Sequence, residues 1–321
     1  MFIWHILIFL FVGFCVVSGQ EIDLEDLATT LAQTEIPIRL SSSQLTFNKD
    51  RTPSAISKRI IGGTEATAHE YPFQAALYVY VGGTIYFCGG SLINEEWILT
   101  AAHCVENSSH IIVFLGSHDL DQPKENSRKI FNSTIYIIHE GWDEDLIQND
   151  IALVKLPQNV TLDKYINTVS IAAGNDNFSG DTSRCLGWGR TIYGSLSNVL
   201  LYVDAPVITN ALCSSYREYT GIIADQHICA SGVGTVGSCN GDSGGPLLIN
   251  GTQVGIVSFG YTDCAAGYPS VYTRLTEFSD WLTDKVENFD ITLYNNSFQI
   301  QSSLKIFIGI ISNVLLVNYL L

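Results

Sequence analysis

Short runs of alternating apolar and polar residues recur through the middle of the chain. Such alternation is typical of β-strands with one buried face. Turn residues separate the runs, and many short strands at this spacing indicate an all-β sandwich or barrel. The clearest runs are QAALYVYV at 74–81, HIIVFLGS at 110–117, RKIFNSTIYII at 128–138 and TQVGIVSFG at 252–260.

One late segment has helical rather than strand periodicity. Between residues 275 and 286, five apolar side chains recur at a spacing that places them on one helical face. They are Leu275, Phe278, Trp281, Leu282 and Val286. We therefore expect a single packed helix near the end of a β-rich domain.

The first 59 residues differ from the middle. Residues 1–19 are almost wholly apolar and end in small residues, which predicts a secretory signal peptide cleaved before Gln20. This segment has His5 but no Lys or Arg, so an N-terminal membrane anchor is the alternative. Residues 20–59 are polar and end in Lys58-Arg59, which indicates a pro-segment ending at a basic cleavage site, with a plain linker as the alternative.

The C-terminal extension, 289–321, is again different. A helix over its apolar part, 306–321, would rise about 24 Å, which is less than the roughly 30 Å hydrocarbon core of a bilayer. The small residues at 295–297, the spacer at 298–305 and the apolar end match a GPI-attachment signal. A short membrane anchor and a packed peripheral tail are the alternatives. We expect an extracellular protein, either secreted or held at the cell surface by this tail.

The net charge and the apolar content of the chain exclude some classes of function. Asp and Glu number 32 against 16 Lys and Arg, for a net charge of −16. This balance argues against nucleic acid or anionic lipid as the main partner, because phosphate binding needs clustered Lys and Arg. The 46% of apolar residues excludes a long disordered chain.

The cysteines and asparagine sequons fit an extracellular chain. Of the 8 cysteines, Cys15 lies in the signal segment, and the rest form no C-x-x-C pairs of a zinc site, so disulfides are favoured. Without Cys15 an odd number of cysteines remains, so one thiol has no disulfide partner within the chain. The N-x-S/T sequons are glycosylation candidates at Asn107, Asn132, Asn159, Asn177, Asn250 and Asn295.

Three polar residues stand in settings that suggest chemistry. Ser243 lies among glycines in GDSGGP, which leave its hydroxyl accessible and the backbone free to point N–H groups into a cavity. His103 follows an apolar run, and Asp150 opens another. Each alone also fits a turn, a cap or a structural role. Together, in the order His, Asp, Ser and at intervals of 47 and 93 residues, they form a much stronger signal than any one of them alone.

Residues 60 to about 286 resemble the chymotrypsin/trypsin-type serine proteases. The motif IIGG at 60–63 after a basic residue resembles their activation site. The motifs TAAHC at 100–104, NDIAL at 149–153 and GDSGGP at 241–246 resemble their three catalytic blocks. The resemblance implies a serine endopeptidase that needs no metal or organic cofactor. Because Ser117 stands where trypsins place a carboxylate, we expect no calcium there.

The resemblance also implies a role for each catalytic residue. Ser243 attacks the scissile carbonyl, His103 takes its proton and later gives it to the leaving amine, and Asp150 orients His103. The backbone N–H groups of Gly241 and Ser243 form the oxyanion hole.

Activation by cleavage is implied as well. Cutting after Arg59, by a trypsin-like protease or a basic-site convertase, would free an ammonium group at Ile60. A buried ammonium needs a partner, and the resemblance assigns Asp242. We expect the uncut chain to be nearly inactive.

The implied fold is two antiparallel six-stranded β-barrels, with the site in the cleft between them and a helix at 275–287. The domains are then a signal (1–19), a pro-segment (20–59), the protease (60–288) and the extension (289–321). The implied disulfides are Cys88–Cys104, Cys213–Cys229 and Cys239–Cys264. Cys185 is left as a buried free thiol, with intermolecular pairing as the alternative.

The residues aligned with the primary specificity pocket indicate the substrate class. Gly237 at the base supplies no carboxylate, which disfavours cleavage after Lys or Arg, and the small walls favour a chymotrypsin-like preference for large apolar or aromatic residues. The strand at 258–260 is expected to hydrogen-bond an extended substrate. The substrate-binding positions are Gly237, Ser238, Ser258, Phe259, Gly260 and Ser270.

Other classes remain as alternatives. A non-catalytic homologue acting as a binding or regulatory protein would keep the same fold. A signalling role and a digestive role are not distinguished. A zinc peptidase or α/β hydrolase is disfavoured, because there is no H-E-x-x-H motif and the order His, Asp, Ser differs from the hydrolase order. Expected partners are protein or peptide substrates and an activating protease, with protein inhibitors as candidates.

Overall fold

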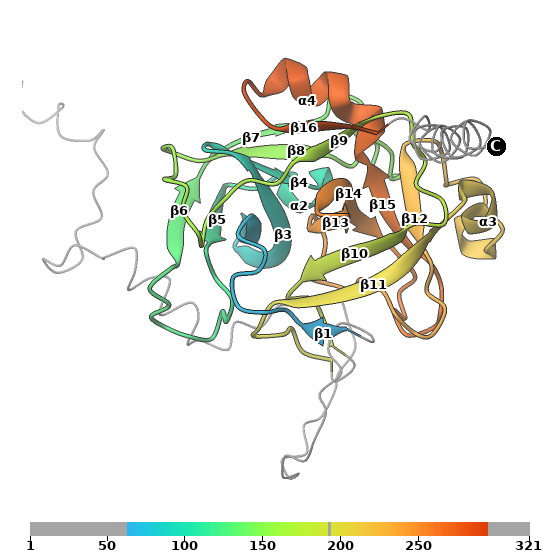
Figure 1. Ribbon diagram of the computed structural model, residues 1–321, viewed down its shortest axis with the longest axis horizontal. Helices are drawn as coiled ribbons and strands as arrows, with labels where there is room; N and C mark the ends of the chain where they lie inside the picture. The colour runs from blue at the N-terminus through green and yellow to red at the C-terminus, as the bar shows by residue number, and fades with distance from the viewer. Residues whose placement is uncertain (1–62, 192–193, 295–321) are drawn as a thin grey trace, which may run out of the picture. The chain divides into compact units, whose positions relative to one another are not determined.

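The alternating runs form strands close to where their patterns predict them. The computed structural model describes residues 63–191 and 194–294, and these form two curled sheets (Figure 1). The run at 74–81 is strand β2, the run at 110–117 gives β5, the run at 128–138 gives β6 and β7, and the run at 252–260 gives β14.

The first sheet has seven strands in the order β6-β5-β2-β3-β4-β8-β7, all antiparallel. Its two end strands, β6 and β7, are separated in the chain only by Thr134, so the backbone itself joins the ends of the curled sheet. The strands are β2 (Gln74–Val81), β3 (Thr84–Asn94), β4 (Trp97–Thr100), β5 (His110–Leu115), β6 (Lys129–Ser133), β7 (Ile135–Ile138) and β8 (Ala152–Lys155).

The second sheet closes into a ring of β13-β10-β11-β12-β15-β14, because β13 also pairs with β14. Strand β9 extends it beside β14, and the short β1 pairs with β11. Its strands are β1 (Thr64–Glu65), β9 (Ile171–Gly174), β10 (Thr182–Gly187), β11 (Leu201–Ile208), β12 (His227–Ala230), β13 (Pro246–Ile249), β14 (Thr252–Phe259), β15 (Ser270–Arg274) and β16 (Ile291–Tyr294). The expected all-β fold is confirmed, with one closed six-stranded barrel and, in place of a second six-stranded barrel, a curled sheet of seven strands.

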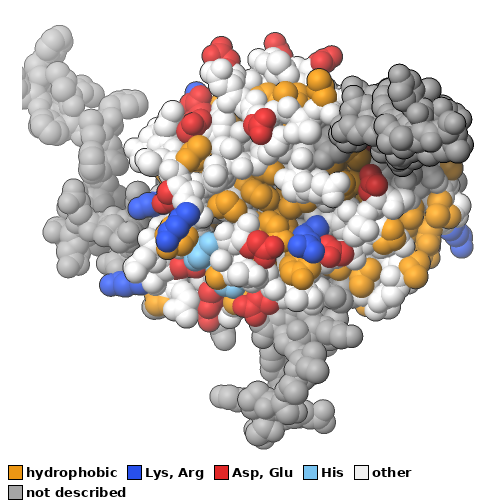
Figure 2. All heavy atoms as spheres, viewed as in Figure 1, with side chains coloured by type: hydrophobic (Ala, Val, Ile, Leu, Met, Phe, Trp, Pro, Cys, Tyr) orange, Lys and Arg blue, Asp and Glu red, His pale blue; other side chains and the backbone are white. Residues whose placement is uncertain are grey.

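Helices are short and few in the described residues. They are α2 (Ala102–Val105), α3 (Asn210–Ser214), α4 (Ser279–Lys285) and the 3₁₀ turns η1 (Arg217–Tyr219) and η2 (Leu275–Phe278). The helix expected at 275–287 is therefore η2 followed by α4. Phe278, Leu282 and Val286 are buried at i, i+4 spacing and join the core of the first sheet. Acidic side chains lie over α4 in Figure 2, where Asp280 and Asp284 are exposed.

Strand β16 continues the second sheet beyond residue 288, where the sequence places the end of the protease domain. It pairs in parallel with β9, from Ile291 opposite Ile171 to Tyr294 opposite Gly174. The hydroxyl groups of Ser170 and Thr292 also share a 2.6 Å hydrogen bond. The start of the C-terminal extension is thus part of the folded sheet.

Pairing of β16 with β9 predicts a measurable gain in stability. A chain ending at Tyr294 should unfold at a temperature about 2–4 °C above one ending at Asn288, which corresponds to about 1 kcal/mol for a domain of this size. The measurement is thermal unfolding followed by circular dichroism. The control is Leu293→Ser in the longer chain, which should have little effect because Leu293 is 71% exposed. If the chains ending at Tyr294 and at Asn288 unfold at the same temperature, the pairing of β16 with β9 does not stabilise the domain.

Candidate active site

The predicted base, His103, lies on α2, directly after the buried strand β4. Strand β4 ends at Thr100 and α2 begins at Ala102, so His103 stands directly beyond the end of a core strand. Its side chain is 31% exposed, whereas the side chain of Asp150 is 1% exposed. One side of the ring therefore faces the protein, and the other can face a substrate.

Asp150 is a buried carboxylate surrounded by hydrogen-bond donors. Its Oδ1 accepts from the His103 backbone N–H at 3.0 Å. Its Oδ2 lies 2.7 Å from His103 Nδ1 and accepts from Ser258 Oγ at 2.5 Å. The Asp150 carbonyl accepts from Thr273 Oγ1 at 2.7 Å. A proton on His103 Nδ1 is held by the carboxylate, which leaves Nε2 as the basic nitrogen.

The pKa values of this pair move in opposite directions. Burial lowers the pKa of His103, but the charge and hydrogen bond of Asp150 outweigh it and raise that pKa above its ordinary value. Burial raises the pKa of Asp150, but the charge and hydrogen bonds of His103, together with Ser258, lower it overall. Asp150 is therefore ionised while His103 is a stronger base than a free imidazole.

Ser243 lies in the loop before β13, and this loop packs against the first sheet. The Gly89 N–H on β3 donates to the Ser243 carbonyl at 2.7 Å. A Cβ on Gly244 would clash with Thr100 Oγ1, and a Cβ on Gly89 would lie 3.0 Å from Gly245 Cα. Ser243 is therefore held beside the strands that lead into α2, and these close approaches require glycine.

Within the described residues, no hydrogen bond joins the Ser243 hydroxyl to the His103 ring. His103 Nε2 instead lies 3.7 Å from Cys104 Sγ, a weak acceptor. Hydrogen bonds between catalytic groups are often long in ligand-free sites and shorten when substrate binds.

The backbone around Ser243 carries two N–H groups that have no acceptor among the described residues. Gly241 has φ +94°, and a Cβ there would lie 2.6 Å from Leu196 Cδ2, so only glycine fits. Within the described residues, neither the Gly241 N–H nor the Ser243 N–H donates to another group. Both donors are free for a negatively charged oxygen.

Asp242, between these two residues, is fully buried. Its Oδ1 accepts from the Gly189 N–H at 2.8 Å and its Oδ2 from the Cys239 N–H at 2.9 Å. A Cβ on Gly187 or Gly189 would clash with the carboxylate. Burial raises the pKa of Asp242 to about 7, although both N–H donors lower it. Over residues 63–191 and 194–294, no cationic side chain pairs with Asp242. Arg59 and Ile60 lie outside the described residues.

Three of the predicted pocket residues, Gly237, Ser238 and Ser270, lie in contact with one another. The Ser238 N–H donates to Ser270 Oγ at 3.2 Å, and a Cβ on Gly237 would lie 2.7 Å from the same oxygen. Nothing stands within 4 Å of a Cβ on Gly260. The hydroxyl of the buried Tyr272 interacts with Ser238 and Ser270. Ser238, Ser270 and Tyr272 thus gather hydroxyl groups at the position where the resemblance predicts the base of the pocket.

One group in the described part of the chain brings three residues of metal-ligating kinds within 4.8 Å of one another: Cys88, His103 and Cys104. The two cysteines form a disulfide, so neither offers the thiolate that a zinc site requires. The residues present therefore do not fit a metal ion.

The disulfides implied by the resemblance are formed: Cys88–Cys104, Cys213–Cys229 and Cys239–Cys264. In the described residues Cys185 is a free, buried thiol, whose pKa burial raises. The last disulfide ties the loop before Ser243 to the segment after Gly260. The sequon asparagines that the structure describes are all exposed: Asn107, Asn132, Asn159, Asn177 and Asn250. Asn295 lies outside the described residues.

Comparison with known proteins agrees with this geometry. The family model for trypsin matches residues 60–282. The chain belongs to the trypsin family of serine proteases. Brachyurin from Leptuca pugilator is 43% identical over 226 residues, which cover 70% of this chain and 96% of that protein. Chymotrypsin from Phaedon cochleariae is 34% identical over 261 residues, which cover 80% of this chain and 92% of that protein.

A solved structure of HL collagenase has the same fold. It matches with a TM-score of 0.65 and 33% identity, over 70% of this chain and 98% of that one. The family resemblance is therefore confirmed, and this trypsin-family chain is a serine endopeptidase.

Two of the groups that surround Asp150 were not predicted from the sequence. The sequence predicts backbone contacts of Ser258 with substrate but no role for its hydroxyl, which bonds Asp150 in the structure, and no role for Thr273. The available signal was a hydroxyl residue in an apolar strand, since a buried hydroxyl needs a partner. The alternation of a strand predicts which of its residues are buried. It does not predict which polar group of another strand a buried hydroxyl contacts.

The electrostatics of Asp150 predict a shift in the pH profile. Asp150→Asn should lower kcat about 10⁴-fold near neutral pH, the loss known for this family's own triad. His103 must be neutral to accept a proton, so activity rises with pH through its pKa. Without the carboxylate that raises this pKa, the acid limb of the residual kcat/KM should move to lower pH.

The measurement is kcat/KM against pH for wild type and variant. Thr273→Val is the matched control, since Thr273 bonds only the Asp150 backbone and its loss should leave the limb in place. If the acid limb stays in place in Asp150→Asn, Asp150 does not raise the pKa of His103 in the active enzyme.

Proposed function

We propose that this serine endopeptidase is secreted as an inactive precursor, is activated by cleavage after Arg59, and cuts peptide bonds after large apolar or aromatic residues. The observation that carries the catalytic part is the bonded cluster of His103, Asp150 and Ser258 beside the loop of Ser243. Ser243 is the nucleophile, His103 the general base and then acid, and Asp150 the orienting carboxylate. The N–H groups of Gly241 and Ser243 stabilise the oxyanion of the tetrahedral intermediate.

The buried carboxylate of Asp242 supports activation by a new N-terminus. A carboxylate with a pKa near 7 is only partly ionised at neutral pH, so its site gains from a cation. The ammonium that cleavage after Arg59 creates at Ile60 is such a cation. Pairing would fix Asp242, and with it the flanking oxyanion donors.

The pocket floor supports the substrate class. Gly237, Ser238 and Ser270 present no carboxylate to pair with Lys or Arg, and Gly260 leaves the wall open. Large uncharged side chains fit such a pocket. The likeness to a collagenase structure makes collagen chains a second candidate substrate.

Secretion is supported by the disulfides and by the exposed sequons. Among the described residues, no helix combines the length and apolar character needed to cross a membrane. The signal segment, 1–19, and the tail, 306–321, lie outside the described residues, and attachment through the tail remains a proposal.

One experiment tests catalysis and activation together. The secreted protein is profiled on a peptide library before and after limited trypsin treatment, with the trypsin then blocked. We expect cleavage only after treatment, with cuts after Phe, Tyr or Leu. Ser243→Ala should still be cut after Arg59 but show no turnover. Asp242→Asn should also be cut but lose at least about 100-fold in activity, because the buried ammonium then lacks its partner.

The contrary outcomes are distinct. Full activity before treatment would overturn the precursor, and turnover by Ser243→Ala would overturn the nucleophile. If Ile60 is confirmed as the new N-terminus and no peptide is cut, the chain is a binding or regulatory homologue.

The neutral pocket floor predicts how specificity can be changed. Gly237→Asp should shift the preferred residue before the cut toward Lys and Arg, because a carboxylate in the pocket pairs with their charge. Any side chain there meets a φ of +158° and lies 2.7 Å from Ser270 Oγ, a strain that the control variant shares. The ratio of kcat/KM for matched Lys and Phe substrates measures the change. Gly237→Asn is the control of equal size, and an equal ratio in both variants would refute the pocket assignment.

A further inference from the structure

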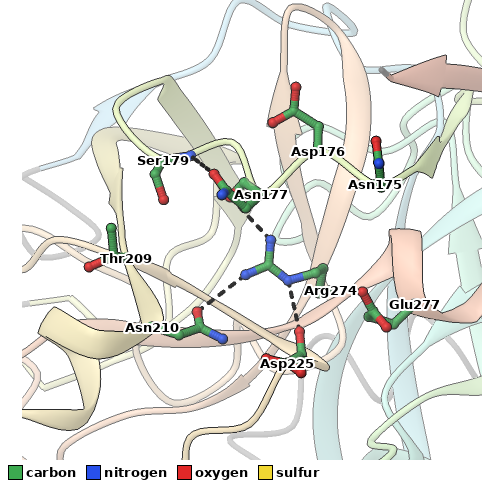
Figure 3. A pocket seen from close by; sticks show the side chains of 9 residues that line it. All are labelled: Asn175, Asp176, Asn177, Ser179, Thr209, Asn210, Asp225, Arg274 and Glu277. Carbon is green, nitrogen blue, oxygen red and sulfur yellow. Dashed lines mark hydrogen bonds between the residues drawn. The ribbon is translucent and has the colours of Figure 1, made fainter. Parts of the chain in front are cut away.

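A polar cavity of about 260 Å³ lies beside the buried residue Arg274 (Figure 3). Its walls come from four parts of the chain: the loop between β9 and β10, the start of α3, the loop before β12 and the turn η2. Every side chain on these walls is polar or charged. The volume is below the roughly 300–1,000 Å³ of sites for drug-sized ligands, so the cavity suits one small hydrophilic group such as a single sugar ring.

Arg274 fixes the walls of this cavity. It is 6% exposed, and its guanidinium donates to the Asp225 carbonyl at 2.9 Å and to the Asn177 carbonyl at 3.1 Å. It also donates to Asn210 Oδ1 at 3.2 Å and to the His227 carbonyl at 2.7 Å. These bonds hold the loop of Asn177, the start of α3 and the loop before β12 in place, so the cavity is preformed.

Two carboxylates on the cavity walls are free to bind a ligand. Asp225 and Glu277 are exposed, and within the described residues neither carboxylate accepts a hydrogen bond. Burial lowers the pKa of Arg274, whereas the charges of Glu277, Asp225 and Asp176 raise it. Carboxylates accept hydrogen bonds from hydroxyl and amide groups, and these charge-assisted bonds are stronger than neutral ones. The walls therefore fit a neutral ligand that is rich in donors.

The walls also include a glycosylation sequon, Asn177-Phe178-Ser179. Asn177 and Ser179 both line the cavity and are exposed, whereas Phe178 between them is 1% exposed and anchors the turn. Asn177 Oδ1 accepts from the Ser179 N–H at 3.0 Å. Among the described residues, nothing accepts a hydrogen bond from Asn177 Nδ2. This nitrogen, the atom that N-glycosylation modifies, is therefore free at the edge of the cavity.

We propose that Asn177 is N-glycosylated and that its first N-acetylglucosamine unit occupies the cavity beside Arg274, where it stabilises the fold around the second sheet. The proposal goes beyond the proposed function and does not depend on catalysis. It rests only on the secretion of the chain, which brings the sequon to the glycosylation machinery.

The transfer leaves the turn of Asn177 intact. A lipid-linked oligosaccharide supplies the sugar: a bond forms between Asn177 Nδ2 and C1 of N-acetylglucosamine, and the bond from C1 to the lipid pyrophosphate breaks. The lipid pyrophosphate leaves, and Nδ2 loses one proton. Oδ1 takes no part in the new bond, so it still accepts from the Ser179 N–H. The hydroxyl groups of the sugar then donate to the carboxylates of Asp225 and Glu277.

The covalent link makes weak contacts sufficient. A free monosaccharide loses translational freedom when it binds, whereas a tethered one is already held at a high effective concentration beside its site. In the folded chain the sugar joins Asn177 to Asp225 and Glu277, which are distant in the sequence. The unfolded chain has no such cavity, so its occupation stabilises the folded state alone.

The test changes the sequon without changing Asn177. Ser179→Ala removes the sequon, whereas Ser179→Thr keeps it. The uncut full chain is made in a host that N-glycosylates, and an endoglycosidase trims each glycan to one N-acetylglucosamine. Peptide mass spectrometry should find this unit on Asn177 in wild type and in Ser179→Thr. Thermal unfolding should occur about 2–4 °C lower in Ser179→Ala than in Ser179→Thr.

Two controls separate the sugar from other effects. In protein made without glycosylation, both Ser179 variants should unfold at the same temperature, because the Ser179 hydroxyl has no hydrogen-bond partner in the described part of the chain. Thr161→Ala removes the sequon of Asn159, which does not line this cavity. Thr161 is exposed, and its replacement should leave the unfolding temperature unchanged.

A change in the cavity wall tests the contact itself. Glu277→Ala should lower the unfolding temperature of the glycosylated protein. Adding it to Ser179→Ala should lower the temperature little further, because both changes remove the same contact. Fully additive effects of the two changes would contradict a contact between the sugar and Glu277.

The other contrary results are distinct. If other sequons carry the sugar and Asn177 does not, the modification is refuted, and a chain without sugar at any sequon would also contradict secretion. If Asn177 carries the sugar but the two Ser179 variants unfold at the same temperature, the sugar does not occupy the cavity. An equal difference between these variants with and without glycosylation would assign the effect to the hydroxyl group.

Discussion

The site depends on one buried charge, the carboxylate of Asp150. It takes donors from two parts of the fold: the His103 N–H and Nδ1–H from α2, which follows β4 of the first sheet, and Ser258 Oγ from β14 of the second. Thr273 of the second sheet bonds its carbonyl as well. Leaving a buried charge without its partner costs about 3–5 kcal/mol, so these donors fix how the two sheets meet at the cleft. The orientation of His103 follows from that arrangement.

A second buried carboxylate, Asp242, constrains the loop of Ser243 in a different way. Asp150 is surrounded by donors and stays ionised, whereas Asp242 has two backbone donors and a pKa raised to about 7. Glycines at 187, 189 and 241 are required because side chains there would meet the carboxylate or Leu196. The loop is therefore preshaped around a site that a cation would complete, which is the physical basis of the proposed activation.

Local sequence patterns were sufficient to predict the strands and to name several residues of the site. The alternation at 74–81 coincides with β2, and the apolar face at 275–286 gives η2 and α4. The motifs around His103, Asp150 and Ser243 named residues that the fold brings together. The partners across the cleft were not predictable, because the bonds from Ser258 to Asp150 and from His227 to Ile147 join residues 108 and 80 positions apart. Strand β16 was missed because its four residues carry too short a pattern.

The central claim is that Ser243 is activated by His103, and labelling tests it most directly. The protein, cleaved after Arg59, is treated with a serine-reactive phosphonate and analysed by peptide mass spectrometry. The account predicts one adduct, on Ser243, that is absent in His103→Ala and forms at most slowly in the uncut chain. No adduct on Ser243 in the cleaved protein, or equal labelling with and without His103, would contradict it.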